Sequence, residues 1–393
     1  MTTPDVTAPR LPWDAADPYP FYESRRRDGD VVWDETAQAW LVLGYHAARE
    51  VLAGPDWISD PRTNRANAEA LKFLNPQFVD ASMLFTDGLP HVRLRGAVRD
   101  VFTRSFISGL TEGVESICAD AVAAVVTGDD FDVMSQIALP LPIAVIGAWL
   151  GLDADQCAAL REHSPTIIRI LGGFADDDEL EAGLAASAAL IADFLPAAAD
   201  RRTNPGDDLL SFIASDPDLT LDEVVVTAIL IAVAGHETTA NLLGASLIRL
   251  LTPDPDGTRL ADRIDPDDPA VITELLRLDS PVQATGRTAT AHQTLNGVEI
   301  CCGDAVLVCI AAANRDTHVY DRPDQFQRGR TGPAPIAFGH GAHYCLGAHL
   351  ARLESTAALR HILQRRPVLA GSVAWRDTPA IRGPLTVPAQ FTT

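Results

Sequence analysis

The feature that most constrains the fold of this chain is one long helix, predicted between residues 221 and 251. The hydroxyl of Thr220 can cap its first turn, and Glu223 can reach back to the Thr220 backbone as the second half of a capping box. The helical pattern continues to about Leu251, and Pro253 then stops it. A helix of roughly 31 residues, at about 1.5 Å each, is about 46 Å long and must cross the whole domain.

The middle of this helix is polar, since residues 234–239 read Ala-Gly-His-Glu-Thr-Thr. A glycine weakens a helix by up to about 1 kcal/mol, and buried Glu and Thr side chains need hydrogen-bond partners. A groove that holds a ligand would explain the segment. A helix that turns a polar face to water would explain it equally well, so the segment alone leaves both interpretations open.

Composition and pattern predict a globular, mainly α fold with small β-sheets. The 393 residues are 47% hydrophobic and 21% charged, which is enough apolar material for a large core. Short strands are expected at 40–44 and 306–310, with turns at Asn296-Gly297 and Gly303-Asp304. No Gly/Ser-rich linker, low-complexity tract or internal repeat divides the chain, so we expect a single domain over residues 1–393.

Charge and hydropathy exclude several classes of function. The net charge of -22 argues against nucleic-acid binding and against a polyanionic substrate. The first 20 residues lack the positive start and apolar run of a signal peptide. The most apolar stretches, 139–152 and 224–234, fall short of the roughly 20 residues that span a bilayer. We therefore expect a cytoplasmic protein without a membrane anchor.

The six cysteines include one with unusual neighbours. They lie at positions 118, 157, 301, 302, 309 and 345 and form no Cys-x-x-Cys pair, which argues against a zinc site or a disulfide framework. For five of them we expect ordinary buried thiols. Cys345 differs because it lies within Phe338-Gly-His-Gly-Ala-His-Tyr-Cys-Leu-Gly347, directly before a helical pattern whose free amides can point at its sulfur.

This ten-residue segment resembles, at every signature position, the haem-binding loop F-x-x-G-x-H-x-C-x-G of the cytochrome P450 family. The resemblance extends in order from about Pro18 to Val387 and implies the bacterial, soluble type. It implies haem b, held between the long helix and the cysteine loop and its helix, with Cys345 as the axial ligand to iron.

The same resemblance assigns further haem contacts. Phe338 is expected to shield the sulfur, Gly347 to let the backbone approach the ring, and His343 to bond a propionate. The other residues that the resemblance places against the haem are His91 and Arg95, one helical turn apart, Arg287 after the Pro281 break, and Ala234 of the long helix.

Glu274 and Arg277 resemble the E-x-x-R pair of the family, which forms a buried ionic cluster with a later arginine. We choose Arg330 as that third member, although Gln327 and Pro335 depart from the usual pattern nearby. The expected role of the cluster is structural.

Glu237 and Thr238 resemble the acid–alcohol pair that relays protons to dioxygen in this family. Peroxide-dependent relatives often lack the alcohol, so Thr238 favours a haem-thiolate monooxygenase that uses O2. The chain carries no flavin or iron–sulfur signature, so the resemblance implies electrons from NAD(P)H through ferredoxin reductase and ferredoxin. The arginines expected near the ligand side, where a ferredoxin would dock, are Arg93, Arg99, Arg104 and Arg352.

The substrate is expected to be a hydrophobic organic molecule, because most candidate pocket segments are apolar. Gln283 is the polar exception. The candidate segments are 70–84, 167–174, 230–234, 281–284 and 383–386. Two other functions stay open at this point: a haem-thiolate peroxygenase or isomerase, and a non-enzymatic haem sensor.

Overall fold

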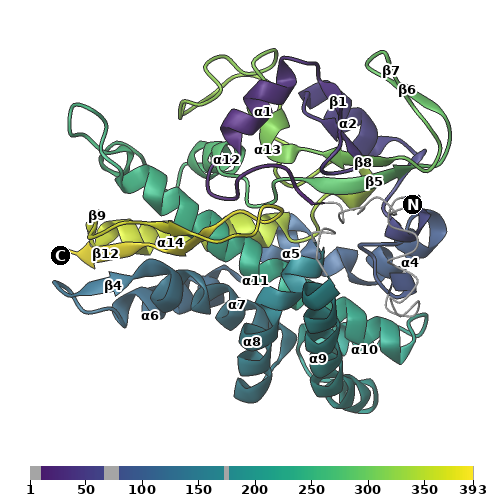
Figure 1. The fold of residues 1–393 in the computed structure, drawn as a ribbon. Coiled ribbons are helices and arrows are strands. Elements are labelled where there is room, and N and C mark those ends of the chain that lie inside the picture. The colour runs from purple at the N-terminus through teal and green to yellow at the C-terminus, as the bar shows by residue number, and fades with distance from the viewer. Residues whose placement is uncertain (1–9, 66–78, 172–176, 393) are drawn as a thin grey trace.

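The computed structural model describes residues 10–65, 79–171 and 177–392 (Figure 1). Its helices are α1 (Tyr19–Arg26), α2 (Tyr45–Ala53), α4 (Gly88–Arg99), α5 (Arg104–Ser108), α6 (Thr111–Ala123), α7 (Pro140–Leu150), α8 (Ala154–Leu171), α9 (Asp177–Thr203), α10 (Leu209–Ala214), α11 (Leu221–Leu251), α12 (Pro269–Leu278), α13 (Ile310–Ala313) and α14 (Ala348–Gln364). A π-helical turn, Met134–Ala138, precedes α7, and short 3-10 turns include Gly341–His343.

The predicted long helix is confirmed as α11, which is continuous over 31 residues. Both halves of its capping box are present: the Glu223 amide donates to the Thr220 hydroxyl at 3.2 Å, and the Thr220 amide donates to the Glu223 carboxylate at 2.8 Å. Thr252 then ends the helix, directly before Pro253. Local capping chemistry therefore fixed both ends.

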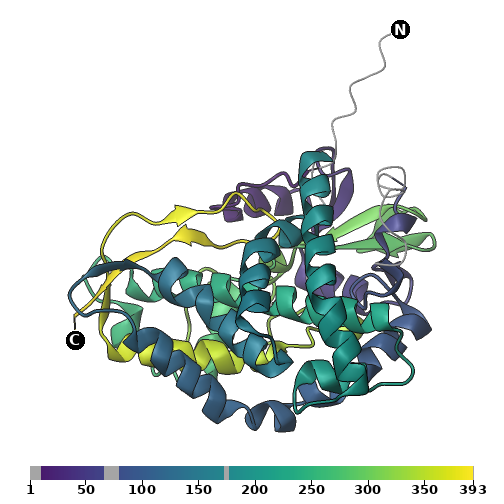
Figure 2. The same cartoon turned by 90° about the horizontal axis from the view of Figure 1, so that it is seen from below.

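Helix α11 is shared by two hydrophobic cores. Its first half, Val224–Val233, packs with α8, α9 and α10, whereas its second half, Ala240–Leu251, packs with α6, α12 and α14. Helices α8 and α9 lie side by side (Figure 2). The polar segment 234–239 belongs to neither core and lies where the two meet. The polar residues therefore mark the boundary between the cores without breaking the helix.

Within the described residues, four small sheets complete the fold. The strands are β1 (Val31–Asp34), β2 (Ala39–Val42), β3 (Trp57–Ile58), β4 (Asp130–Asp132), β5 (Thr285–Ala289), β6 (Gln293–Leu295), β7 (Val298–Ile300), β8 (Ala305–Val308), β9 (Pro367–Leu369), β10 (Ala374–Trp375), β11 (Pro384–Thr386) and β12 (Pro388–Phe391). The largest sheet has the order β1-β2-β8-β5-β3. Its two predicted strands, β2 and β8, pair in parallel, with Trp40 opposite Val306.

The predicted turn at Asn296-Gly297 joins β6 and β7, and both residues have positive φ, as a tight hairpin turn requires. The turn at Gly303 (φ +84°) precedes β8. It carries Cys301 and Cys302, which are exposed, so the prediction that these two thiols are buried was wrong. This turn connects two strands of different sheets, and such connections run over the surface whatever residues they contain. Cys118 and Cys309 are buried, as predicted, and Cys157 is half-buried.

By length and composition alone, two helices of the described chain are apolar enough to cross a bilayer: 178–203 within α9, and α11. The sequence prediction that no apolar stretch is long enough to span a bilayer was therefore wrong. In α11, 78% of the apolar window is buried inside the fold, as expected for a core helix.

The predicted ionic cluster is confirmed, and it includes Arg330. The Arg277 guanidinium donates two hydrogen bonds of 2.8 Å to Glu274, and the Arg330 Nε donates a third at 2.9 Å. Glu274 is 4% exposed and Arg277 is 1% exposed. Burial raises the pKa of Glu274, but the bonds from both arginines outweigh it and lower that pKa overall. The cluster joins α12 to the loop that leads to the cysteine segment.

Replacement of Glu274 by alanine should unfold much of the protein, because it leaves two arginines of the cluster without their counter-charge. Loss of one partner from a buried ion pair costs about 3 to 5 kcal/mol. We expect a lower denaturant midpoint and mostly haem-free protein or aggregate, measured by urea titration and haem content. Glu299→Ala removes an exposed carboxylate from β7 and should leave both quantities unchanged. Soluble Glu274→Ala protein with full haem and a wild-type midpoint would contradict a structural role.

Candidate active site

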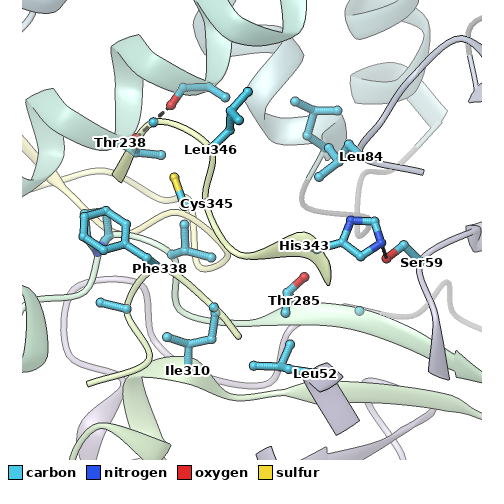
Figure 3. Close-up of a pocket in the computed structure, with 18 of the residues that line it drawn as sticks. Leu52, Ser59, Leu84, Thr238, Thr285, Ile310, Phe338, His343, Cys345 and Leu346 are labelled. Carbon is cyan, nitrogen blue, oxygen red and sulfur yellow. Dashed lines mark hydrogen bonds between the residues drawn. The ribbon is translucent and has the colours of Figure 1, made fainter. Parts of the chain in front are cut away.

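A cavity of about 460 Å³ lies between α11, the largest sheet and the cysteine loop. In Figure 3, the sulfur of Cys345 points from its loop toward α11, where Thr238 lies, while Thr285 and Ile310 approach from the sheet side. His343 lies beside Ser59 at the edge of the cavity. Most of the wall is apolar, and its charged groups lie near the cysteine loop.

The cysteine loop is held in shape by its own backbone. The Cys345 amide donates to the Phe338 carbonyl at 2.8 Å, which closes the loop directly before α14. Gly341 has φ +74°, and a Cβ there would collide with the backbone of Leu52 in α2. This turn therefore requires glycine at position 341.

The Cys345 sulfur is buried, and the start of α14 partly compensates for the cost of a negative charge there. Burial raises the pKa of the thiol, and a hydrogen bond from the Gly347 amide and the nearby Arg95 guanidinium partly offset that effect. The predicted contact between the helix amides and the sulfur is thus present. Coordination to a metal ion would remove the thiol proton outright.

Gly347 faces open space. Its φ is -81°, which any residue adopts, and no protein atom lies within 4 Å of the position that a Cβ would take. Neither backbone strain nor packing within the described protein calls for glycine here. A flat group lying directly on this backbone would call for it.

Two arginines at the cavity wall have no carboxylate partner. Among the described residues, no Asp or Glu lies within ion-pair distance of Arg95 or Arg287. Arg287 is only 8% exposed and donates to the Gly286 carbonyl at 2.7 Å, while Arg95 donates to the Tyr344 carbonyl at 2.5 Å. Burial lowers the pKa of both side chains. A guanidinium group as buried as that of Arg287 is normally paired, and Arg95 adds a second, half-buried positive charge, so this wall suits an anionic ligand.

Two histidines lie next to these arginines, with ring centroids 4.2 Å apart. The His343 Nε2 lies 3.0 Å from Asp87 and 3.2 Å from the Ser59 hydroxyl. His91 is buried behind it, and its Nε2 has no partner in the described structure. Burial, then His343 and Arg95, lower the pKa of His91 to about 4, so this imidazole is neutral at pH 7.

The polar segment of α11 presents different side chains to its two sides. Ala234 and Thr238 line the cavity, and the Thr238 hydroxyl donates to the Ala234 carbonyl at 2.8 Å. Glu237 does not line the cavity. It is 1% exposed, and Arg376 donates to its carboxylate at 2.5 Å. Burial raises the pKa of Glu237, and Arg376 partly offsets that rise.

These residues fit a haem. Cys345 could supply a sulfur ligand, the open face of Gly347 leaves room for a flat ring, and Arg95 and Arg287, which have no carboxylate within ion-pair distance, could bind two propionate groups. Of the site residues predicted from the sequence, the cavity wall contains Arg95, Ala234, Thr238, Arg287, Phe338, His343, Cys345 and Gly347. His91 lies behind His343, and Glu237 lies on another face of α11.

Sequence reasoning missed Arg376, because its partner Glu237 is 139 residues away and no motif surrounds it. It also missed Asp87 and Ser59 as partners of His343. The prediction of Gln283 as a pocket residue was wrong: its amide is fully buried and bonds the Ser280 carbonyl and the Tyr22 hydroxyl, since a buried amide needs partners. Segment 383–386 lies outside the cavity wall, because Gly383 packs against Asn241. Segments 70–78 and 172–174 fall outside the described residues.

Comparison with known proteins agrees with this geometry. The family model of cytochrome P450 matches residues 269–370. The cytochrome P450 monooxygenase PikC of Streptomyces venezuelae is 36% identical over 396 residues, covering 96% of this chain and 92% of PikC. The vitamin D(3) 25-hydroxylase of Pseudonocardia autotrophica is 32% identical over 94% of this chain and 93% of its own.

The fold is also similar to that of solved cytochrome P450 structures. The ligand-free crystal structure of CYP164A2 from Mycobacterium smegmatis superposes with a TM-score of 0.85 at 31% identity, covering 95% of this chain and 96% of that one. Fold, cysteine loop and full-length similarity thus agree, and the chain is a member of the cytochrome P450 family, a haem b monooxygenase of the bacterial type.

Proposed function

We propose that this monooxygenase inserts one oxygen atom of O2 into a hydrophobic organic substrate, with electrons from NAD(P)H delivered by ferredoxin reductase and ferredoxin. The observation that carries the proposal is the position of Thr238, whose hydroxyl lies on the cavity wall across from the Cys345 sulfur (Figure 3). An alcohol at this place can hold and pass a proton, which activation of O2 requires and a simple haem carrier does not.

The side chains around the cavity divide the work. Haem with a thiolate ligand supplies the chemistry of O–O bond cleavage. Cys345 would hold the iron, Arg95 and Arg287 would neutralise the propionates, and Phe338 would keep water from the sulfur. The guanidinium of Arg352 lies 5.2 Å from the Phe338 ring and fixes its position.

Thr238 has capacity left for proton transfer. Its hydroxyl proton is donated to the Ala234 carbonyl, so its oxygen keeps free lone pairs toward the cavity. Glu237, the residue directly before Thr238, would supply the proton from the far side of α11. This division between a proton source behind the helix and an alcohol in front of it limits the water that enters the cavity.

The apolar wall supports a hydrophobic substrate. Carbon side chains dominate the part of the cavity away from the cysteine loop, including Met83, Phe85, Leu171, Leu230 and Val282. Val282 was predicted there from the sequence. The relative named vitamin D(3) 25-hydroxylase acts on a large apolar molecule, and a substrate of that kind suits this wall.

The surface beside the cysteine loop supports docking of a small redox partner. Arg99 ends α4 and Arg104 begins α5, and both are exposed, as are the apolar side chains of Leu89 and Val92 in α4 and of Tyr344 in the cysteine loop. Three of the four arginines predicted for this patch have partners within the protein: Arg99 pairs with Asp100, Arg93 pairs with Glu223, and Arg352 packs on Phe338 and bonds Thr273. Exposed aromatic and arginine side chains are enriched at protein interfaces. We also infer a cytoplasmic location, where NAD(P)H is available.

Loss of Cys345 should abolish the thiolate signature. In the wild-type protein the ferrous carbonyl complex should show a strongly red-shifted Soret band, because Cys345 would hold the iron through a thiolate. Cys345→Ala should lose this band. Cys301→Ala and Cys309→Ala should keep it, since neither thiol lies at the cavity wall. A histidine-type spectrum from fresh wild-type protein would refute the ligand assignment.

Loss of the Thr238 hydroxyl should separate electron use from product formation. We expect Thr238→Ala to bind substrate and consume NAD(P)H with ferredoxin and its reductase, while product per NAD(P)H falls and hydrogen peroxide rises. Thr238→Ser keeps the hydroxyl and should stay close to wild type. Thr227→Val removes a buried hydroxyl from the first half of the same helix and should not change coupling.

The same assay separates the proposed function from its alternatives. Wild-type product should require NAD(P)H, ferredoxin and its reductase. Product formed equally well with peroxide alone, or unchanged coupling in Thr238→Ala, would favour a peroxygenase. Absence of product with every electron source would leave haem sensing as the better assignment.

A further inference from the structure

The side of α11 that faces away from the cavity holds a buried polar cluster. Glu237 receives one hydrogen bond, from Arg376, and its Oε1 has no partner among the described residues. Two nearby buried atoms also have no hydrogen-bond partner in the described structure: Arg376 Nε, and Oδ1 of Asn241, which lies one helical turn further along α11. Buried polar atoms of this kind are normally satisfied by internal water. The cluster therefore offers three polar atoms beside α11 that water could bind.

The C-terminal strands bring Arg376 to this place. Arg376 directly follows β10, and its amide donates to the Gly383 carbonyl at 3.1 Å, just before β11. A Cβ on Gly383 would collide with the side chain of Asn241, so only glycine lets this hairpin lie against α11. The hairpin thus fixes the guanidinium next to Glu237. The Arg376 side chain remains 16% exposed, so the cluster reaches the surface there.

We propose that Arg376 is a positioning residue that binds the Glu237 carboxyl and holds it turned away from the cavity, so that the acid collects protons from outside and delivers them through α11 to Thr238. This inference rests on the proposed function, in which Glu237 supplies the proton. In each cycle the Glu237 carboxylate accepts a proton from water at the exposed end of Arg376. The carboxyl then releases that proton toward Thr238, and Arg376 keeps its own proton throughout.

The charges near Glu237 support this role. Burial favours its neutral form, and Arg376 is the cation that opposes this effect. His236 lies 4.0 Å away on the same helix, but burial lowers its pKa to about 4, so it is uncharged at pH 7. Arg161 of α8 lowers the pKa of His236 rather than that of Glu237. The charge state of Glu237 therefore depends on Arg376.

Infrared titration of the ferric, haem-loaded protein tests the inference without substrate or redox partner. The band of the protonated Glu237 carboxyl is the one that Glu237→Gln removes. Because an opposite charge nearby lowers a carboxyl pKa by about 1 to 3 units, Arg376→Gln should move the midpoint of this band up by about 1 to 3 pH units. Arg376→Lys should restore most of the wild-type midpoint. Asp377→Asn changes an exposed charge on the adjacent residue and should leave the midpoint in place.

Turnover gives a second readout. Arg376→Gln should slow product formation and enlarge its solvent deuterium isotope effect, because proton supply becomes slower. If Arg376→Gln does not retain haem, the double variant Arg376→Gln/Glu237→Gln leaves no buried charge stranded. It should match Glu237→Gln alone, since each change removes the same path. An additive loss in the double variant would overturn the inference.

The infrared result also separates this inference from the proposed function. An unshifted midpoint in Arg376→Gln would overturn the positioning role even if the wild-type protein hydroxylates substrates. A shifted midpoint in a protein that forms no product with ferredoxin would support the role of Arg376 in holding Glu237 and would refute the proposed reaction.

Discussion

The structure depends on α11, which has two roles: it packs into two hydrophobic cores, and it forms one wall of the cavity. Each half of the helix packs in a different hydrophobic core, so the helix cannot move without disturbing both cores. Between them, the segment 234–239 is free of core contacts on the cavity side and can carry polar groups. A stiff helix clamped at both ends holds the Thr238 hydroxyl in a fixed position relative to the Cys345 sulfur, which a loop would not do.

Buried charges in this protein are satisfied in three different ways. The Glu274 cluster is complete within the protein, since its carboxylate receives bonds from two arginines and a backbone amide. Glu237 is half-satisfied, with one oxygen bonded and one free. Arg95 and Arg287 have only backbone or hydroxyl partners in the described chain. The degree of internal satisfaction thus separates structural charges from charges that await protons or a ligand.

The parts of the fold and the site that depend on neighbouring residues were predictable. The ends of α11, the hairpin turn at Asn296-Gly297 and the cysteine loop are each determined within about ten residues, so their signals survive in the sequence. Arg330 was predictable only through the family resemblance. Arg376 was not predictable, because nothing near it in the chain indicates that a distant strand pairs with α11. Gln283 was misassigned for the same reason, since its partner Tyr22 lies at the other end of the chain.

Arg95 and Arg287 make the stability of the folded protein depend on the supply of haem in the cell. Without an anionic ligand, the wall around them carries two partly buried positive charges with no carboxylate at ion-pair distance, which raises the free energy of the folded apoprotein. A ligand that binds only the folded state lowers that free energy in proportion to the logarithm of its concentration. The amount of folded protein in a cell is therefore set by the supply of haem as well as by the rate of translation. A shortage of iron or porphyrin would reduce its level even with unchanged messenger RNA.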